Sequence, residues 1–148
     1  MESTMTSQAE ILAKLYKNMK MGVESVTKLL PKVHDGEFKT RLTDQLDGYE
    51  DFASKAKTML SELGEMAKDE KPMVKFWSSV GIAMNTMIDT SSSHIAEMII
   101  EGSTMGITDT TKIINEYENN TECKNAVDLA RDIVKFEQNN IEIMKNYL

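Results

Sequence analysis

Long stretches with apolar residues at helical spacing are the feature that most constrains what this chain of 148 residues can fold into. Apolar residues that recur every three or four positions line one side of an α-helix. Four such stretches, at about residues 7–31, 36–67, 91–118 and 122–147, make up most of the sequence. Only two prolines occur, and the alternation typical of β-strands is not seen. The pattern predicts an all-α protein.

The residues between the stretches indicate where helices begin and end. SQAE, which starts at Ser7, is a capping-box pattern, so the first helix is expected to begin there. Pro31 should end or kink that helix, and Asp35 is a good N-cap for the second. A shorter helix is expected at 73–88. The run DTSSS then predicts that a new helix begins near Ser91.

Two glycines lie inside the third long stretch. Gly102 and Gly106 lower the helix propensity, but they also permit close approach of a neighbouring helix, so we expect one continuous helix. The alternative is a break at Gly106, with Thr108 capping a new helix. If the helix is continuous, Asp109 falls on its apolar side. If it breaks at Gly106, Asp109 lies in the first turn of the new helix. We expect its carboxylate to be solvated or locally paired.

These elements fit a single domain over residues 1–148: an antiparallel four-helix bundle with an extra short helix between its second and third long helices. The formal net charge of −7 argues against nucleic-acid binding, which needs clustered Lys and Arg residues. A run of about 18 apolar residues is also missing, so no membrane span is expected. MESTMTSQAE lacks the basic and apolar segments of a secretory signal, so we expect a cytoplasmic protein.

A polar pair interrupts the apolar side of the last helix. At about 100° per residue, Glu137 points inward with its apolar neighbours, and Asn140 lies beside it. A buried carboxylate is costly unless it is paired or protonated. On the second long helix, Tyr49 or Gln45 could donate a hydrogen bond to Glu137. We call Gln45, Tyr49, Glu137 and Asn140 the buried polar layer.

The order of these segments resembles that of the ferritin-like bundles. It is similar to uncharacterised bacterial ferritin-like families, distant relatives of rubrerythrin and bacterioferritin. The resemblance is carried by YEDFASKAKTML in the second long helix, SSSHIAEMIIEGSTMGITDTTKIINEYE in the third and IVKFEQNNIEIMKNYL in the fourth. The short Trp-containing helix before SSSH also fits. The resemblance implies a ferritin-like fold and raises the question of a di-iron centre.

The expected iron ligands are incomplete. Di-iron bundles use a Glu from each of two helices and a Glu-x-x-His from each of the other two. Here Glu137-x-x-Asn140 has an amide in place of the imidazole, and Gln45-x-x-Gly48 has neither ligand. We therefore expect a degenerate metal site and no cofactor.

A second set of metal-ligating residue types lies on the third long helix. His94, Glu97 and Glu101 share one face, which could hold a single metal ion. That face lies off the apolar stripe, so we expect a solvated surface there and keep the metal site as the weaker alternative.

Three functions remain open. The first is a non-enzymatic bundle that acts through protein contacts, as a homo-oligomer or with another protein, through Phe76, Trp77 and methionines of the short helix. The second is a metal-binding redox or storage protein with an atypical site at the buried polar layer or around His94. The third is a bundle that holds a small apolar ligand between its helices, where the glycines of the third long helix leave room.

Overall fold

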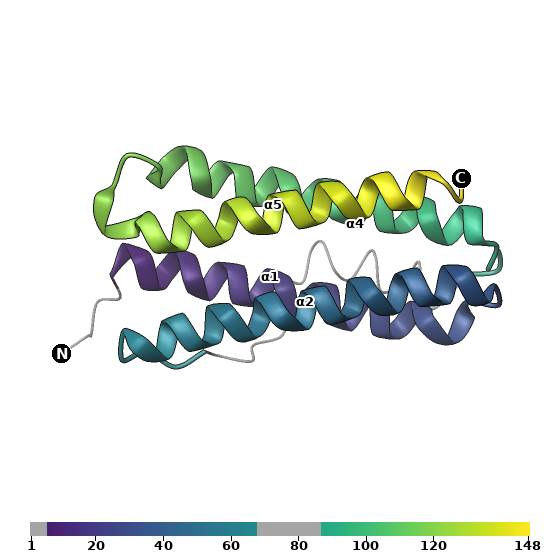
Figure 1. Ribbon diagram of the computed structural model, residues 1–148, viewed down its shortest axis with the longest axis horizontal. Coiled ribbons are helices and arrows are strands. Elements are labelled where there is room, and N and C mark those ends of the chain that lie inside the picture. Colours follow the sequence, from purple (N-terminus) through teal and green to yellow (C-terminus); the bar gives the residue numbers. More distant parts are fainter. Residues whose placement is uncertain (1–5, 68–86) are drawn as a thin grey trace.

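The computed structural model describes residues 6–67 and 87–148, which form four long α-helices (Figure 1). They are α1 (Ser7–Leu29), α2 (Gly36–Glu62), α4 (Ser92–Tyr117) and α5 (Lys124–Lys145), with short 3-10 turns at Leu30–Lys32 and Thr121–Cys123. The prediction of an all-α bundle of four long helices is confirmed. Most of the expected short helix, residues 73–86, lies outside the described residues, and residues 87–88 are not helical.

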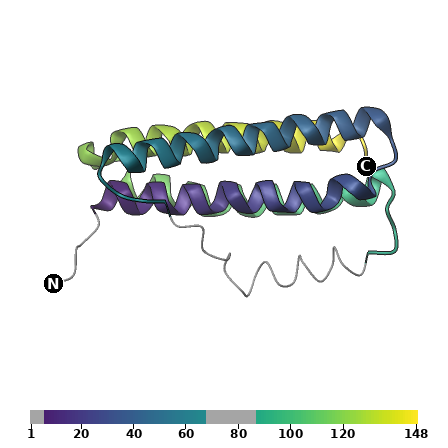
Figure 2. The ribbon, with the colours of Figure 1, turned by 90° about the horizontal axis from the view of Figure 1, so that it is seen from below.

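The four helices form two antiparallel hairpins that pack against each other. One hairpin is α1 with α2, and the other is α4 with α5. Figure 2 shows two layers, with α1 beside α4 in one and α2 beside α5 in the other. Because α2 and α4 run in the same direction, residues 63–91 join opposite ends of the bundle. The expected antiparallel pairing is therefore confirmed within each hairpin. The two hairpins are joined by one long connection.

The helices begin where short polar side chains can cap them. Asp35 accepts a hydrogen bond from the Phe38 amide at 3.1 Å, and Ser91 accepts one from the His94 amide at 3.2 Å. At the first helix the cap is Thr6 rather than Ser7, because the Thr6 hydroxyl accepts from the Ala9 amide at 3.2 Å. Each side chain satisfies an amide that has no partner inside its helix. The third long helix is continuous through its two glycines.

The second long helix ends earlier than its apolar pattern predicts. The expected end was residue 67, but α2 ends at Glu62. Gly64 adopts a φ of 77°, in the left-handed region that favours glycine. Its amide donates to the Ser61 carbonyl, and the Glu65 amide donates to the Leu60 carbonyl, each at 3.0 Å. These two bonds form a Schellman motif, which ends the helix.

The core lies between the two layers and contains residues from all four helices. Its largest fully buried apolar side chains are Phe38, Ile11, Leu12, Leu15, Leu29, Leu42, Leu60, Ile95, Ile133 and Met144. Near the chain's C-terminus, the ring of Tyr147 stacks on that of Phe38 with centroids 4.6 Å apart. This contact holds the end of α5 against the start of α2.

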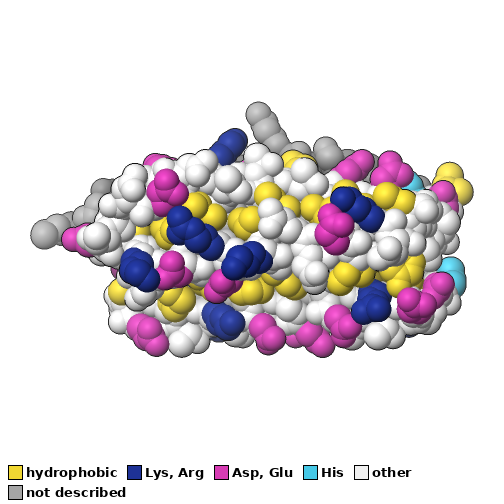
Figure 3. All heavy atoms as spheres, turned by 45° about the horizontal axis from the view of Figure 1, so that its top comes forward, with side chains coloured by type: hydrophobic (Ala, Val, Ile, Leu, Met, Phe, Trp, Pro, Cys, Tyr) yellow, Lys and Arg dark blue, Asp and Glu magenta, His cyan; other side chains and the backbone are white. Residues whose placement is uncertain are grey.

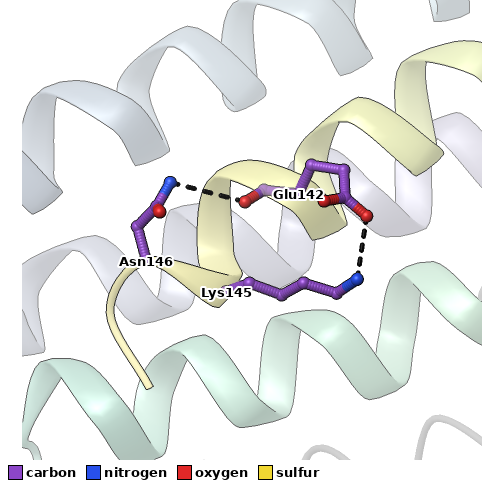
Figure 4. Close-up of polar contacts among 3 residues, drawn as sticks. All are labelled: Glu142, Lys145 and Asn146. Carbon is purple, nitrogen blue, oxygen red and sulfur yellow. Dashed lines mark hydrogen bonds and ion pairs between the residues drawn. The ribbon is translucent and has the colours of Figure 1, made fainter.

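Surface charges contribute much less to holding the bundle together. At the end of α5, Lys145 pairs with Glu142 at 2.8 Å, and Nδ2 of the Asn146 side chain donates to the Glu142 backbone carbonyl at 3.5 Å (Figure 4). Both charged side chains are more than half exposed, so the pair adds little stability. On the face in Figure 3, positive and negative side chains are interspersed.

Within residues 6–67 and 87–148, no helix has the length and apolarity needed to cross a membrane.

Candidate functional site

A buried carboxylate lies between the two hairpins at mid-length. Glu137 of α5 is 3% exposed. Its Oε1 accepts a short hydrogen bond from the hydroxyl of Tyr49 on α2, and a longer one from Nδ2 of Asn140 at 3.5 Å. Tyr49 is itself packed edge-on against Phe136, with ring centroids 5.0 Å apart. The Tyr49–Glu137 bond therefore joins one hairpin to the other inside the core.

Burial changes the ionisation of this carboxyl. Loss of water raises the pKa of Glu137 from 4.5 to about 7, although the hydrogen bonds from Tyr49 and Asn140 lower it. The pKa of Tyr49 is raised well above its usual value, first by burial and then by the nearby Glu137. Tyr49 consequently keeps its proton and remains a donor, while Glu137 exchanges its proton near neutral pH.

Three glycines make room for this polar layer. A methyl group at Gly22 of α1 would overlap the ring of Tyr49, and one at Gly48 of α2 would overlap the ring of Phe136. A methyl group at Gly106 of α4 would lie 2.7 Å from Oε2 of Glu137. These positions must stay small because side chains from the facing helices occupy the space that a Cβ would need.

Replacing Gly22 with Ala is expected to lower the free energy of unfolding by about 1 kcal/mol or more, because overpacking outweighs the gain in helix propensity. Gly102→Ala is the matched control, since no atom of residues 6–67 or 87–148 lies within 4 Å of its added methyl group. That change should raise the free energy of unfolding by about 1 kcal/mol. Urea unfolding of both variants checks the prediction, and shifts of the same sign would contradict it.

An open cavity lies next to the buried polar layer, between α1 and α4. Its volume is about 410 Å³. Met19, Gly22 and Val26 of α1 and Met98, Gly102 and Met105 of α4 line its sides, and Tyr49 and Glu137 line its inner end. We call this space the α1–α4 cavity. Its lining is mostly apolar, with a carboxyl group of unusual pKa among the residues that form it.

Two residues that line the cavity have hydroxyl groups that are buried and have no hydrogen-bond partner among the described residues. They are Ser103 and Thr110, which are 2% and 1% exposed. Both lie on the same face of α4 as Gly106, three residues before it and four after it. Ser103 lies close enough to Tyr49 to lower its pKa. Buried polar atoms are nearly always hydrogen-bonded, so unpartnered hydroxyl groups at a cavity indicate a place where a ligand or water can bind.

Gln45 behaves differently from the other three members of the predicted buried polar layer. It is 2% exposed, but neither its amide nitrogen nor its amide oxygen has a partner among the described residues. Of the two donors considered for Glu137, the structure thus uses Tyr49, and Gln45 is outside the hydrogen-bonded cluster. We have no physical account of its unpaired amide.

The residues considered for a metal site are not gathered around one point. In the part of the chain that the structure describes, no three His, Cys, Asp or Glu side chains are placed to hold a metal ion. His94, Glu97 and Glu101 each line the α1–α4 cavity, but both glutamates are exposed. Asp109 also lines the cavity and is exposed to solvent, in agreement with the solvated alternative for that residue.

Helical periodicity placed the residues of the polar layer, and the glycines of the third long helix suggested room for a ligand, but neither gave the position of the cavity. The cavity depends on how far α1 lies from α4, which no single-helix pattern contains. The glycines and the small polar residues of α4 were the available signal, because small side chains on an inward face can leave space.

In comparisons with known proteins, no family model, curated protein or solved structure matches this chain.

Proposed function

We propose that this protein is a non-enzymatic, ferritin-like bundle that binds a small, largely apolar molecule in the α1–α4 cavity. The ferritin-like part of the proposal is supported by the chain path. Ferritin-like bundles have one long connection that joins two antiparallel hairpins. Here residues 63–91 link opposite ends of the bundle, so that α2 and α4 are parallel.

The cavity is the observation that carries the binding function. Ligand pockets in proteins commonly have volumes of about 300–1,000 Å³, apolar walls and a few polar groups that orient the ligand. The α1–α4 cavity has a volume of about 410 Å³. The residues around it include Glu137 with its carboxyl, and Ser103 and Thr110 with their buried hydroxyls. This combination favours a ligand with an apolar body and one polar end.

The non-enzymatic part of the proposal is supported by the composition of the site. Among the described residues, Glu137 is the one carboxylate that is buried. Its contacts are a tyrosine hydroxyl and an amide, neither of which readily exchanges protons near neutral pH. General acid–base catalysis at a bound substrate usually needs a second titratable group with a complementary role.

Function through protein contacts remains a prediction. Its proposed surface, Phe76 and Trp77, lies outside the described residues. Light scattering of the purified protein tests it, since a protein that stays monomeric and brings no partner through purification would count against that function.

A neutral fluorescent dye tests ligand binding. Nile red is expected to bind saturably, one dye per chain, with an increase in fluorescence as it enters apolar surroundings. The Gly102→Leu change places a side chain in open space at the cavity wall. It should weaken binding by roughly tenfold or more, because overlap with a ligand costs on the order of 1–3 kcal/mol.

A matched glycine provides the control for this experiment. Gly36 begins α2 and is exposed, and no atom of the described part of the chain lies within 4 Å of an added Cβ, but it does not line the cavity. Gly36→Leu should therefore leave dye binding unchanged. Absence of saturable binding, or an equal effect of the two substitutions, would overturn the proposed site.

A further inference from the structure

We infer that the ligand of the α1–α4 cavity is an organic cation, an alkyl chain with a primary ammonium group that pairs with Glu137. This inference rests on the proposed function and adds the chemical class of the ligand. It follows from the charges around the cavity, from the free oxygen atoms at its inner end and from the shape of the space.

The charged residues that line the cavity are nearly all acidic. They are Glu97, Glu101 and Asp109 of α4 and Glu137 of α5. Neither α1 nor α2 contributes a charged side chain, and Tyr49 of α2 stays protonated. Among the described residues that line the cavity, His94 is the one basic residue type, and none is Lys or Arg. A negative rim and a buried carboxylate attract a cation and disfavour an anion.

Free hydrogen-bond acceptors at the inner end match an ammonium group. Both hydrogen bonds that Glu137 accepts end on Oε1. Its Oε2 lies beside Gly106, which lines the cavity and has no side chain to cover that oxygen. The Ser103 hydroxyl lies close enough to Tyr49 for hydrogen bonding to lower the pKa of Tyr49, but no other described residue reaches it. A primary ammonium carries three donors and no acceptor, so it can donate to both oxygens.

The second free hydroxyl lies too far away for the same head group. Thr110 follows Ser103 by seven residues, or about 10 Å along the helix axis. One nitrogen cannot reach both hydroxyls, so Ser103 is the neighbour we assign to the ammonium. The apolar body of the ligand would lie along the methionines of the walls, such as Met19, Met98 and Met105. Methionine side chains adapt readily to the shape of an apolar guest.

This assignment predicts how binding depends on pH. The pKa of Glu137 is about 7 in the free protein, so its carboxyl is largely neutral at pH 6 and largely ionised at pH 8. An alkylammonium, with a pKa of about 10, stays charged over that range. Its binding should become tighter as the pH rises from 6 to 8. Apart from Glu137 and Tyr49, the titratable side chains that line the cavity are those of His94, Glu97, Glu101 and Asp109, all on α4.

Isothermal titration calorimetry with three octyl compounds tests the inference on the full chain. The probes are octylammonium, 1-octanol and octanoate, which share an apolar tail and differ in the head. At pH 8 octylammonium should bind roughly tenfold or more tightly than octanol, as expected for hydrogen bonds to a charged group. Octanoate should bind most weakly. The preference for octylammonium should shrink at pH 6.

Two substitutions separate the inference from the proposed function. Glu137→Gln keeps the size of the side chain but removes its charge, and it should reduce the preference for octylammonium over octanol to within about threefold at both pH values. Gly102→Leu should weaken all three probes, while Gly36→Leu should weaken none. The circular dichroism spectrum of each variant, recorded at both pH values, checks that it remains folded.

The possible results have distinct meanings. Equal binding of octylammonium and octanol, with both blocked by Gly102→Leu, would overturn the cationic ligand but leave the cavity as a binding site. A preference for octanoate, or a preference for octylammonium that survives Glu137→Gln, would do the same. If none of the probes binds, or if Gly102→Leu changes nothing, the proposed site itself is wrong.

Discussion

Replacing Glu137 with Gln should stabilise the protein by about 3 kcal/mol above pH 8 and by little below pH 4.5. The carboxyl has a pKa of 4.5 in a solvated chain and about 7 in the folded protein. This difference corresponds to about 3 kcal/mol. The side chain is 3% exposed, so solvent screens the effect weakly. A glutamine of the same size avoids the cost of burying a charge and keeps an oxygen for the Tyr49 hydroxyl.

The sign follows from proton binding. Between pH 4.5 and 7 the folded protein binds more protons at Glu137 than the unfolded chain does, so its contribution to stability falls as the pH rises. That contribution is fully present below pH 4.5 and is lost as the pH passes through about 7. Glutamine does not titrate, so the advantage of the variant should grow across this window and then level off.

Urea unfolding of both proteins from pH 4 to 9 measures this prediction. The difference between the two free energies of unfolding is the relevant quantity, because the contributions of all other carboxylates cancel in it. A difference that stays constant across the window would show that Glu137 has an ordinary pKa. A loss of stability in the variant at pH 8 would show that the carboxylate itself stabilises the fold.

Replacing Tyr49 with Phe should destabilise the protein by about 1.5–3 kcal/mol at pH 8, the range for a hydrogen bond to a charged group. Tyr49 is the closer of the two donors to Glu137, since the bond from Asn140 is 3.5 Å long. Without the hydroxyl, a nearly bare carboxylate would remain in the core. At pH 5 the carboxyl is protonated and the loss should be smaller, about 1 kcal/mol.

The double variant Tyr49→Phe with Glu137→Gln provides the control. The coupling between the two side chains, obtained from the four free energies of unfolding, should be large at pH 8 and small at pH 5. Phe136, which touches the same ring of Tyr49, is unchanged in all four proteins. A coupling near zero at pH 8 would mean that the two groups do not stabilise each other in solution.

The inward direction of Glu137 was accessible from the sequence because it depends on a local property. Side chains separated by three, four or seven positions share one face of a helix, so the apolar neighbours of Glu137 indicate where it points. The N-cap Asp35 was readable for the same reason, since a cap involves only neighbouring residues, and so was a helix start within the run DTSSS, where the structure uses Ser91. The prediction that α4 is continuous needed one further argument, namely that its two glycines permit close approach of a neighbouring helix.

The features that escaped prediction depend on the backbone or on other helices. The end of α2 is set by the left-handed conformation of Gly64, and the same glycine could equally have lain within a helix. The need for glycine at positions 22 and 48 comes from aromatic rings on facing helices. The unpaired amide of Gln45 and the hydroxyls at the cavity likewise depend on which neighbours reach them.

The division of the molecule into two hairpins also has a consequence for how a ligand would enter and leave the α1–α4 cavity. Each hairpin keeps its own antiparallel partner helix, whereas α1 and α4 belong to different hairpins and have the open space between them. We therefore expect the proposed ligand to enter or leave when these two helices move slightly apart, without unfolding of either hairpin. Release would then be limited by a small relative motion of two intact halves, one of the low-energy openings that folded proteins undergo.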